Sequence, residues 1–406
     1  MRILLVHNYY QSSSPSGEDV VFDNERQLLE SAGHEVICYS RRNDDISSSI
    51  LERAAAAGSL FWSLRSYREI SALIKKHQPQ VAHFHNTFPL ISTSAYAACR
   101  DNLLPVVQTL HNYRLICPSG LLLRNGRPCE KCIGNQMLPA IQHACYRQSR
   151  IGTALVAGML NINRALGTYE RNVDRYVCLT EGARQRFIRG GLPPEKLLIK
   201  PNVLRDAPGI GSGDGGYALY VGRLTSEKGV TSLVDSWRQM NYPLKIAGDG
   251  ALRTILEQTC RTSGAQVEFL GFRSRDEITT LMQRASLLII PSECYEGFPM
   301  TVLEGLATGT PLLVSALGAL DELVQAPEHG YKFKAGDPDD LREKATALLA
   351  NTDRLQTMRL ANRALFDRRY SLKQSIGNLE HVYQEAIACR TNSHTVSIQR
   401  SVENNA

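Results

Sequence analysis

The stretch that decides the fold is Leu287-Leu288-Ile289-Ile290-Pro291-Ser292-Glu293-Cys294-Tyr295-Glu296-Gly297-Phe298-Pro299-Met300-Thr301-Val302-Leu303-Glu304-Gly305. Its first four residues are all apolar, as in a strand that is buried on both faces of a parallel sheet. Pro299 disfavours helix at Phe298 and suits the first position of a helix, so a helix is expected to begin there. A buried strand, a polar loop and a helix in this order form one βα unit of an α/β fold.

The same alternation of strand and helix runs through both halves of the 406-residue chain. We expect strands at 2–7, 36–38, 80–84, 105–109, 175–179, 196–200, 217–221, 244–247, 267–270, 287–290 and 311–314. The pattern predicts two Rossmann-like, doubly wound α/β domains that face a cleft, with ligands at the carboxyl ends of the strands.

The domain boundaries follow from changes in composition. Segment 204–216 is rich in Gly, Pro, Ser and Asp, so it is expected to link an N-terminal domain at 1–203 to a C-terminal domain at 217–371. A C-terminal helix at 372–390 is expected to cross back to the first domain. The polar residues 391–406 are expected to form a disordered tail.

Composition excludes several classes of protein. No run of residues approaches the roughly 18 to 20 apolar residues of a membrane-spanning helix, and the apolar start is too short for a secretion signal. The expected location is therefore cytoplasmic, either free or on the inner face of the cell membrane. Residues 1–200 contain 24 Lys and Arg against 16 Asp and Glu, and the remainder contains 22 against 24. Any anionic surface is expected to meet the basic first half.

Two glutamates flank the expected helix start. The backbone amides of Met300, Thr301 and Val302 would be open at the positive end of this helix, where they could bind phosphate. Glu296 would lie at the rim of that site and Glu304 about one turn inside, where each carboxylate could accept hydrogen bonds from hydroxyl groups. The arrangement suits a ligand with phosphate in the middle and hydroxyls at both ends, such as a nucleotide sugar.

A second segment, Gly222-Arg223-Leu224-Thr225-Ser226-Glu227-Lys228-Gly229, follows the first strand of the same domain. Arg223 and Lys228 could neutralise a diphosphate leaving group there. No catalytic metal is expected, because these two cations and the helix amides would stabilise the diphosphate.

These two motifs resemble those of the retaining nucleotide-sugar glycosyltransferases of family 4, which have the GT-B fold. The resemblance rests on Gly-Arg-Leu-x3-Lys-Gly at 222–229 and Glu-Gly-Phe-Pro-x4-Glu at 296–304. It implies that a sugar moves from a nucleotide diphosphate to a glycan or polyprenyl-linked acceptor in surface-polysaccharide synthesis. The implied roles are contact with the sugar for Glu296, Gly297 and Phe298, with the ribose for Glu304, and with the diphosphate for Gly222, Arg223 and Lys228.

The same resemblance implies roles in the first domain. His111 follows the strand that ends at Thr109, where the family carries a histidine that contacts the transferred sugar. His85 ends the preceding strand and is the weaker candidate. Gly17 lies where the family usually has a pair of glycines near the donor phosphate, but this chain has one.

Four of the ten cysteines, Cys117, Cys129, Cys132 and Cys145, lie close together in the sequence. A Cys-x2-Cys core with two flanking thiols in a cytoplasmic protein favours a structural zinc site over disulfides. Such a site within the Cys-rich insert 112–150 could shape the acceptor side. The alternative is four ordinary cysteines in a long loop.

Residues 51–76 mix apolar and basic side chains. They are interpreted either as packed helices with a solvated basic face or as a surface that rests on anionic lipid.

Other functions of the protein also remain open. A nucleotide-sugar epimerase would share the fold, a zinc-knuckle nucleic-acid-binding protein would use the basic half but lacks interleaved aromatic residues, and a regulatory protein would bind the donor without turnover.

Overall fold

The computed structural model describes residues 1–10, 16–45, 58–134 and 136–403, with side chains up to residue 391. The chain divides into two compact units. The first comprises residues 1–120, 131–205 and 372–406, and the second comprises residues 121–130 and 206–371.

The first unit is built on a parallel sheet with the strand order β2-β1-β3-β4-β7-β8. Its strands are β1 (Arg2–Tyr9), β2 (Glu35–Arg42), β3 (Val81–Asn86), β4 (Val106–Thr109), β7 (Arg175–Cys178) and β8 (Leu197–Ile199). All six residues of β3 are buried, as expected for a strand covered on both faces. The strand order reverses between β1 and β3, which is where such sheets bind ligands.

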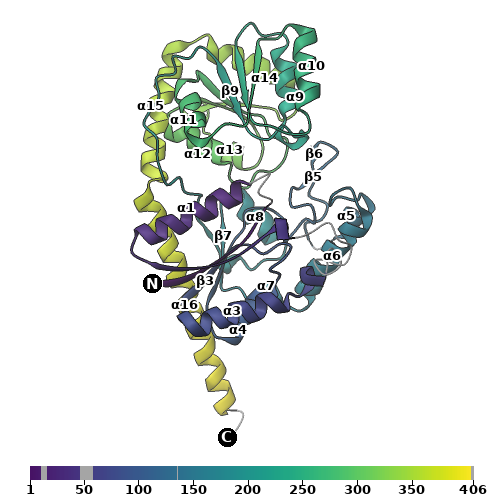
Figure 1. Cartoon of the computed structure of the whole chain (residues 1–406), viewed down its shortest axis with the longest axis vertical. Helices are drawn as coiled ribbons and strands as arrows, with labels where there is room; N and C mark the ends of the chain where they lie inside the picture. The colour runs from purple at the N-terminus through teal and green to yellow at the C-terminus, as the bar shows by residue number, and fades with distance from the viewer. Residues whose placement is uncertain (11–15, 46–57, 135, 404–406) are drawn as a thin grey trace. The chain divides into compact units, whose positions relative to one another are not determined.

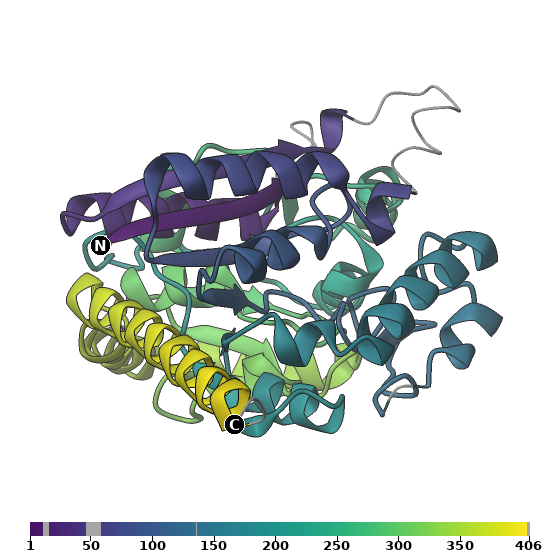
Figure 2. The ribbon, with the colours of Figure 1, turned by 90° about the horizontal axis from the view of Figure 1, so that it is seen from below.

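Helices cover this sheet in the manner of a doubly wound fold. They are α1 (Gly17–Ser31), α3 (Leu64–His77), α4 (Ser94–Asp101), α5 (Leu138–Gln142), α6 (Arg150–Ala165), α7 (Thr168–Arg171), α8 (Glu181–Arg189) and α16 (Leu372–Glu403). Within this unit, α5 and α6 stand on the side away from α16 (Figures 1 and 2). The capping box of α1, formed by Ser16 and Asp19, begins the helix at Gly17.

The second unit repeats the architecture with the strand order β11-β10-β9-β12-β13-β14. Its parallel strands are β9 (Ala218–Val221), β10 (Leu244–Ala247), β11 (Val267–Gly271), β12 (Leu287–Ile290), β13 (Leu312–Ser315) and β14 (Gly330–Phe333). Strand order reverses between β9 and β12. The predicted fold class, two Rossmann-like domains, is therefore confirmed.

The helices of the second unit are α9 (Val230–Trp237), α10 (Arg253–Ser263), α11 (Arg275–Arg284), α12 (Met300–Ala307), α13 (Ala319–Leu323), α14 (Pro338–Leu349) and α15 (Thr352–Arg369). Figure 1 shows α9, α10 and α14 on one side of β9, with α11 and α12 on the other. Trp237 of α9 is fully buried in the cluster on the first of these faces. Gly305 lets α12 approach the sheet, because a Cβ there would lie 2.8 Å from the side chains of Leu288 and Leu312.

The Gly-rich segment that we expected to be a linker is packed against the second unit over much of its length. Gly211, Gly213 and Gly215 donate backbone hydrogen bonds to Thr308, Gln283 and Arg284. A Cβ at Gly211 would lie 2.1 Å from the carbonyl oxygen of Gln283. The glycines in this segment therefore permit close packing, which composition alone does not distinguish from flexibility.

The end of the chain also differs from expectation. Helix α16 continues to Glu403, so residues 391–403 of the predicted disordered tail are helical. Residues 404–406 lie outside the described residues. The physical reason is that no Gly or Pro follows Gly377 to stop the helix.

Residues 121–130 carry the small hairpin β5 (Leu123–Arg124) and β6 (Arg127–Pro128) and are grouped with the second unit. Across the described residues, no helix has the length and apolar character needed to span a bilayer.

Candidate functional site

The predicted donor residues gather at the point of the second unit where the strand order reverses. Strands β9 and β12 are neighbours in the sheet. The loop after β9 carries Arg223 and Lys228, and the loop after β12 carries Glu296. Because both loops leave the carboxyl ends of adjacent parallel strands, residues far apart in the sequence meet there.

Gly229 sets the distance between these two loops. Its φ of +66° is in the left-handed region, and a Cβ on it would lie 1.9 Å from the carbonyl oxygen of Pro291. A backbone hydrogen bond from Glu293 N to Glu227 O, 3.0 Å long, joins the loops at the same place. Only glycine permits this approach without displacement of the backbone.

The approach brings Lys228 against Glu296. Nζ of Lys228 lies 2.6 Å from Oε1 of Glu296, and the hydroxyl of Ser292 donates to the same oxygen at 2.6 Å. Burial alone would raise the pKa of Glu296, but the Lys228 charge and these hydrogen bonds hold it below the usual range. Burial would lower the pKa of Lys228, but the adjacent Glu296 raises it. The site therefore contains an ionised carboxylate and an ammonium group.

Arg223 is the exposed cation of this site. Its side chain is 57% exposed and lies 3.3 Å from Oε1 of Glu227. Oε1 of Glu227 also accepts a hydrogen bond from the hydroxyl of Thr225 at 2.7 Å. The backbone carbonyl of Arg223 accepts from the hydroxyl of Tyr220, which fixes the start of the loop. The guanidinium can therefore turn to an anionic ligand while its backbone stays in place.

Helix α12 begins at Met300, one residue after the predicted start, with Pro299 as its N-cap. One of the three amides that we expected to be open is occupied, because Val302 N–H donates to the carbonyl of Pro299 at 3.1 Å. A tight first turn of this kind is common at helix ends. Met300 and Thr301 are the first two helical residues, so their amides have no acceptor within the helix. An anion site at this helix therefore has two amides instead of three.

Glu304 lies one turn into α12 and is partly buried. Burial raises its pKa, and the positive charge of Arg275 offsets only part of that effect. Glu296 and Glu304 therefore have pKa values displaced in opposite directions. Beside them Gly297 precedes buried Phe298, whose ring packs edge-on against Tyr370 with a centroid distance of 6.0 Å.

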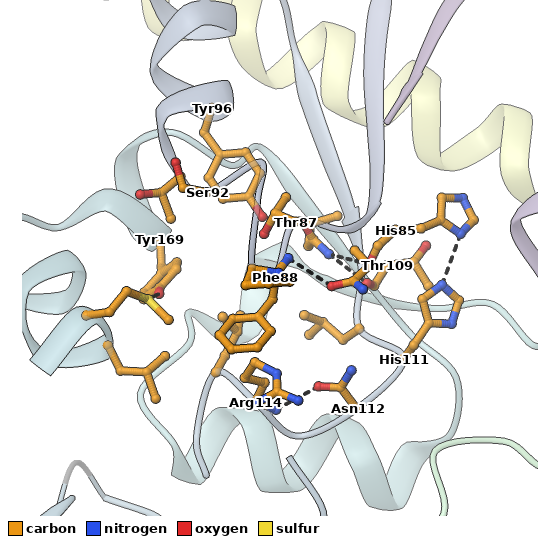
Figure 3. A pocket seen from close by; sticks show the side chains of 18 of the residues that line it. His85, Thr87, Phe88, Ser92, Tyr96, Thr109, His111, Asn112, Arg114 and Tyr169 are labelled. Atoms are coloured by element: carbon orange, nitrogen blue, oxygen red, sulfur yellow. Dashed lines mark hydrogen bonds between the residues drawn. The ribbon is translucent and has the colours of Figure 1, made fainter. Parts of the chain in front are cut away.

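In the first unit, His111 follows β4 and lines a pocket of about 60 Å³. Figure 3 shows His111, Asn112 and Arg114 along one side of this pocket. The guanidinium of Arg114 lies over the ring of Phe88 at 4.2 Å. This volume is enough for a few water molecules.

Gly17, the first residue of α1, has no atom within 4 Å of the position that a Cβ would occupy. The side chain of the next residue, Glu18, accepts a hydrogen bond from Asn112 at 2.7 Å. This contact places the start of α1 beside the segment after β4. The structure thus brings Gly17 and His111 to the same end of the first unit's sheet.

Zinc binding by the four cysteines is a prediction that depends on how close their sulfur atoms lie. Tetrahedral zinc would hold the sulfur atoms roughly 3.8 Å apart. Among the described residues, the three thiols of the first unit, Cys117, Cys132 and Cys145, do not lie within 4.8 Å of one another as a group. Cys129 belongs to the segment grouped with the second unit, and no disulfide joins any of the ten cysteines. A zinc site stays a prediction from the spacing, and metal analysis of the purified full chain tests it.

Sequence reasoning missed a cluster of buried polar groups behind His111. Glu25, His83 and Lys200 are each at most 1% exposed. The signal was present in the alternation His83-Phe84-His85, which puts two histidines on one face of a buried strand. Buried charged residues are rare unless they are paired, and no pattern identified the partner, Lys200, 175 positions away from Glu25.

Comparison with known proteins agrees with this geometry. Residues 16–204 match the family described as Glycosyltransferase Family 4, and residues 208–364 match Glycosyl transferases group 1. These matches identify two glycosyltransferase domains in the chain, and its fold is the GT-B fold.

Individual relatives of this glycosyltransferase are distant. An uncharacterized glycosyltransferase of Methanocaldococcus jannaschii is 28% identical over 215 residues, so the match spans 53% of this chain and 60% of that protein's length. A putative teichuronic acid biosynthesis glycosyltransferase of Bacillus subtilis, TuaC, is 23% identical and covers 81% of this chain and 84% of its own. The structure of Anabaena HepE in complex with UDP has a TM-score of 0.66 at 16% identity, with 95% of this chain and 100% of that one covered. At this identity the likeness shows the fold.

The role of Gly229 in this glycosyltransferase leads to a stability prediction. In Gly229→Ala the added Cβ meets the carbonyl of Pro291, so we expect the free energy of unfolding to fall by roughly 2 to 4 kcal/mol. Denaturant unfolding of the purified variant measures this change.

Gly264→Ala is the matched control. Gly264 has a φ of +70°, but nothing lies within 4 Å of the position of its Cβ. Only the left-handed strain remains, about 1 to 2 kcal/mol. Equal losses in the two variants would contradict the contact between Gly229 and Pro291.

Proposed function

We propose that this glycosyltransferase moves a sugar from a nucleotide diphosphate to a hydroxyl of a glycan or polyprenyl-linked acceptor, with retention at the anomeric carbon, in the synthesis of a surface polysaccharide. The observation that carries the proposal is the grouping of Arg223, Lys228, Glu296 and the start of α12 at one switch point. These groups are two cations, an ionised carboxylate and a helix end, which is the set that a sugar diphosphate requires.

Each donor group has a role that its surroundings support. The amides of Met300 and Thr301 and the guanidinium of Arg223 hold the diphosphate. Lys228 neutralises the charge that develops as the diphosphate leaves. Glu304 accepts hydrogen bonds from the ribose hydroxyls. The HepE structures support a nucleotide donor, since they contain UDP or UDP-glucose.

The reaction exchanges one bond at the anomeric carbon for another. The bond from this carbon to the diphosphate oxygen breaks, and a bond to the acceptor oxygen forms on the same face. The acceptor proton passes to the departing diphosphate oxygen, so this route requires no side-chain base. Glu296 contacts sugar hydroxyls while Lys228 holds its carboxylate in place.

For the acceptor side, an exposed apolar surface supports a lipid-linked substrate. On α6, Ile151 is 78% and Ile162 is 50% exposed. Leu155 on the same helix and Leu166, its C-cap residue, are also exposed and are again eleven residues apart. Positions four and eleven residues apart fall on one side of a helix. We name Ile151, Leu155, Ile162 and Leu166 the α6 face.

Charge indicates what would cover the α6 face. Residues 131–169 contain no Asp or Glu, and they include Arg147 and Arg150, both exposed beside Ile151. An apolar surface next to basic side chains suits a bilayer that contains anionic lipid. This surface replaces the stretch 51–76 as the proposed contact. Residues 51–57 of that stretch lie outside the described residues, and α3 buries Ile70 and Ile74 against the unit.

Variants at the donor site test the first part of the proposal. Glu304→Gln and Arg223→Ala should each raise the dissociation constant for the donor about tenfold or more, because each loses a charge-assisted hydrogen bond. Calorimetric titration with UDP, GDP and ADP sugars measures this change. Burial raises the pKa of Glu304, so wild-type affinity should fall with decreasing pH at values above the ordinary pKa of glutamate. Glu304→Gln should abolish that fall.

Glu268→Gln and Arg261→Ala are controls, since both residues are exposed in the same unit. Unchanged donor affinity in Glu304→Gln and Arg223→Ala would overturn the assignment. Incubation with donor alone separates a transferase from an epimerase, because only an epimerase would change the free donor's sugar.

The α6 face predicts binding to anionic vesicles. In a flotation assay, Ile151→Ser combined with Leu155→Ser should reduce the bound fraction of the full chain roughly tenfold, because two exposed apolar side chains are removed. Vesicles of neutral lipid should bind the wild type weakly.

The matched control is Ile255→Ser combined with Leu360→Ser. These residues are 60% and 67% exposed in the second unit. An equal loss of binding in this control, or no binding by the wild type, would contradict the proposed surface.

A further inference from the structure

A chain of buried polar groups leads from the interior of the first unit to His111. The ammonium of Lys200 contacts Oε1 of Glu25. The other carboxylate oxygen, Oε2, lies 3.4 Å from Nε2 of His85. Nδ1 of His85 lies 3.0 Å from Nε2 of His111, and Figure 3 shows the two rings joined by this contact. The groups come from α1, β3 and the segments after β4 and β8, so only the folded unit assembles them.

The charge at the inner end of this chain is fixed. Burial alone would raise the pKa of Glu25, but the charge of Lys200 and the contact with His85 hold it well below the usual range. Glu25 is therefore an ionised carboxylate, which can only accept hydrogen bonds. Among the described residues, neither Oε2 of Glu25 nor Nε2 of His85 has a hydrogen-bond partner, so the 3.4 Å contact between these two atoms is electrostatic. An N–H at Nε2 would be attracted to this carboxylate, whereas a lone pair would be repelled.

The position of the proton on His85 determines the tautomer of His111. A neutral imidazole has one N–H and one acceptor nitrogen. If His85 carries its proton on Nε2, its Nδ1 must accept, and Nε2 of His111 must donate. His111 then has a lone pair on Nδ1, which has no hydrogen-bond partner among the described residues. The ring itself lines the pocket of the first unit.

Burial supports the neutral state of both rings. It lowers the pKa of His85, although Glu25 acts in the opposite direction, and it lowers the pKa of His111 well below the usual value. The two other histidines near His85, His7 and His83, are buried and form hydrogen bonds with other residues. His7 lies 2.8 Å from Asp19, and His83 lies 2.7 Å from Thr109.

We propose that Glu25 and His85 are positioning residues that hold His111 in its Nε2–H tautomer, so that Nδ1 of His111 accepts a hydrogen bond from a hydroxyl group of the ligand. The nature of that ligand, a sugar, rests on the proposed function. The tautomer itself does not, because it follows from contacts within the first unit. In proteins, the hydrogen bond at one imidazole nitrogen commonly determines whether the other nitrogen carries a proton or a lone pair.

A metal ion is the competing explanation for this cluster. Glu25, His83 and His85 are the one group of three in the described part of the chain whose donor atoms lie within 4.8 Å of one another. Lys200 already supplies a positive charge at Glu25. Both nitrogens of His83 lie within 3.0 Å of hydroxyl oxygens, those of Thr109 and Tyr383. The Lys200 ammonium and these two hydroxyls therefore already contact the atoms of Glu25 and His83 that a metal ion would use.

The test is long-range ¹H–¹⁵N NMR of the full chain with ¹⁵N-labelled histidines, with the His111 signals identified from their loss in His111→Gln. We expect wild-type His111 to be neutral at pH 7 and protonated on Nε2 alone. His85→Phe keeps an aromatic ring beside His111 but removes the acceptor, so His111 should become a mixture of both tautomers. A His111 that is charged, or protonated on Nδ1, in the wild type would overturn the proposal.

His7→Phe is the matched control. His7 is a buried ring 6.2 Å from His85 between centroids, but it is bonded to Asp19 and lies outside the chain of groups. The tautomer of His111 should not change in this variant, and an equal change in both variants would contradict the proposal. If His85→Phe does not fold, the wild-type spectrum alone decides. Donor titration separates the two proposals, since the tautomer can hold without donor binding, and donor can bind with another tautomer.

Discussion

The close approach of two loops at Gly229 is the constraint on which the proposed donor site depends. The carbonyl of Pro291 occupies the space that any side chain at position 229 would need. Because the loops touch there, Lys228 reaches Glu296 across 68 residues of sequence. Gly229 therefore allows the two loops to pack closely, and this packing places Lys228 and Glu296 side by side.

Each unit has an ion pair near the point where its strand order reverses. In the second unit the pair of Lys228 and Glu296 is partly exposed, with 24% and 14% of each side chain accessible. In the first unit the pair of Lys200 and Glu25 is at most 1% exposed. Buried ion pairs lose much of their attraction to desolvation, so they contribute little net stability. We therefore propose that both pairs orient a neighbouring group toward a ligand.

The sequence predicted the fold well because the central strands are short, apolar and bounded by turn residues. Among the strands of the two parallel sheets, the exception was β14, where Lys332 interrupts a four-residue strand at the edge of its sheet. Proline at 299 placed the start of α12 to within one residue, but it could not reveal that the amide of Val302 is already bonded.

Other features could not be predicted because they depend on contacts distant in sequence. Composition marked 204–216 as a linker, whereas packing decides what its glycines do. His111 was predicted from its place after a strand, but its partners required coordinates, since Glu25 and Lys200 look like ordinary surface charges in a sequence. The cysteine spacing indicated zinc, and the thiols of the first unit are not gathered as zinc ligands.

We propose that a nucleoside diphosphate binds where the loops after β9 and β12 meet. The most direct test is a crystal structure of the full chain with whichever of UDP, GDP and ADP it binds most tightly. We expect the diphosphate at the amides of Met300 and Thr301, with a ribose hydroxyl on Glu304. A nucleotide bound elsewhere, with Glu304 turned away from it, would contradict this proposal.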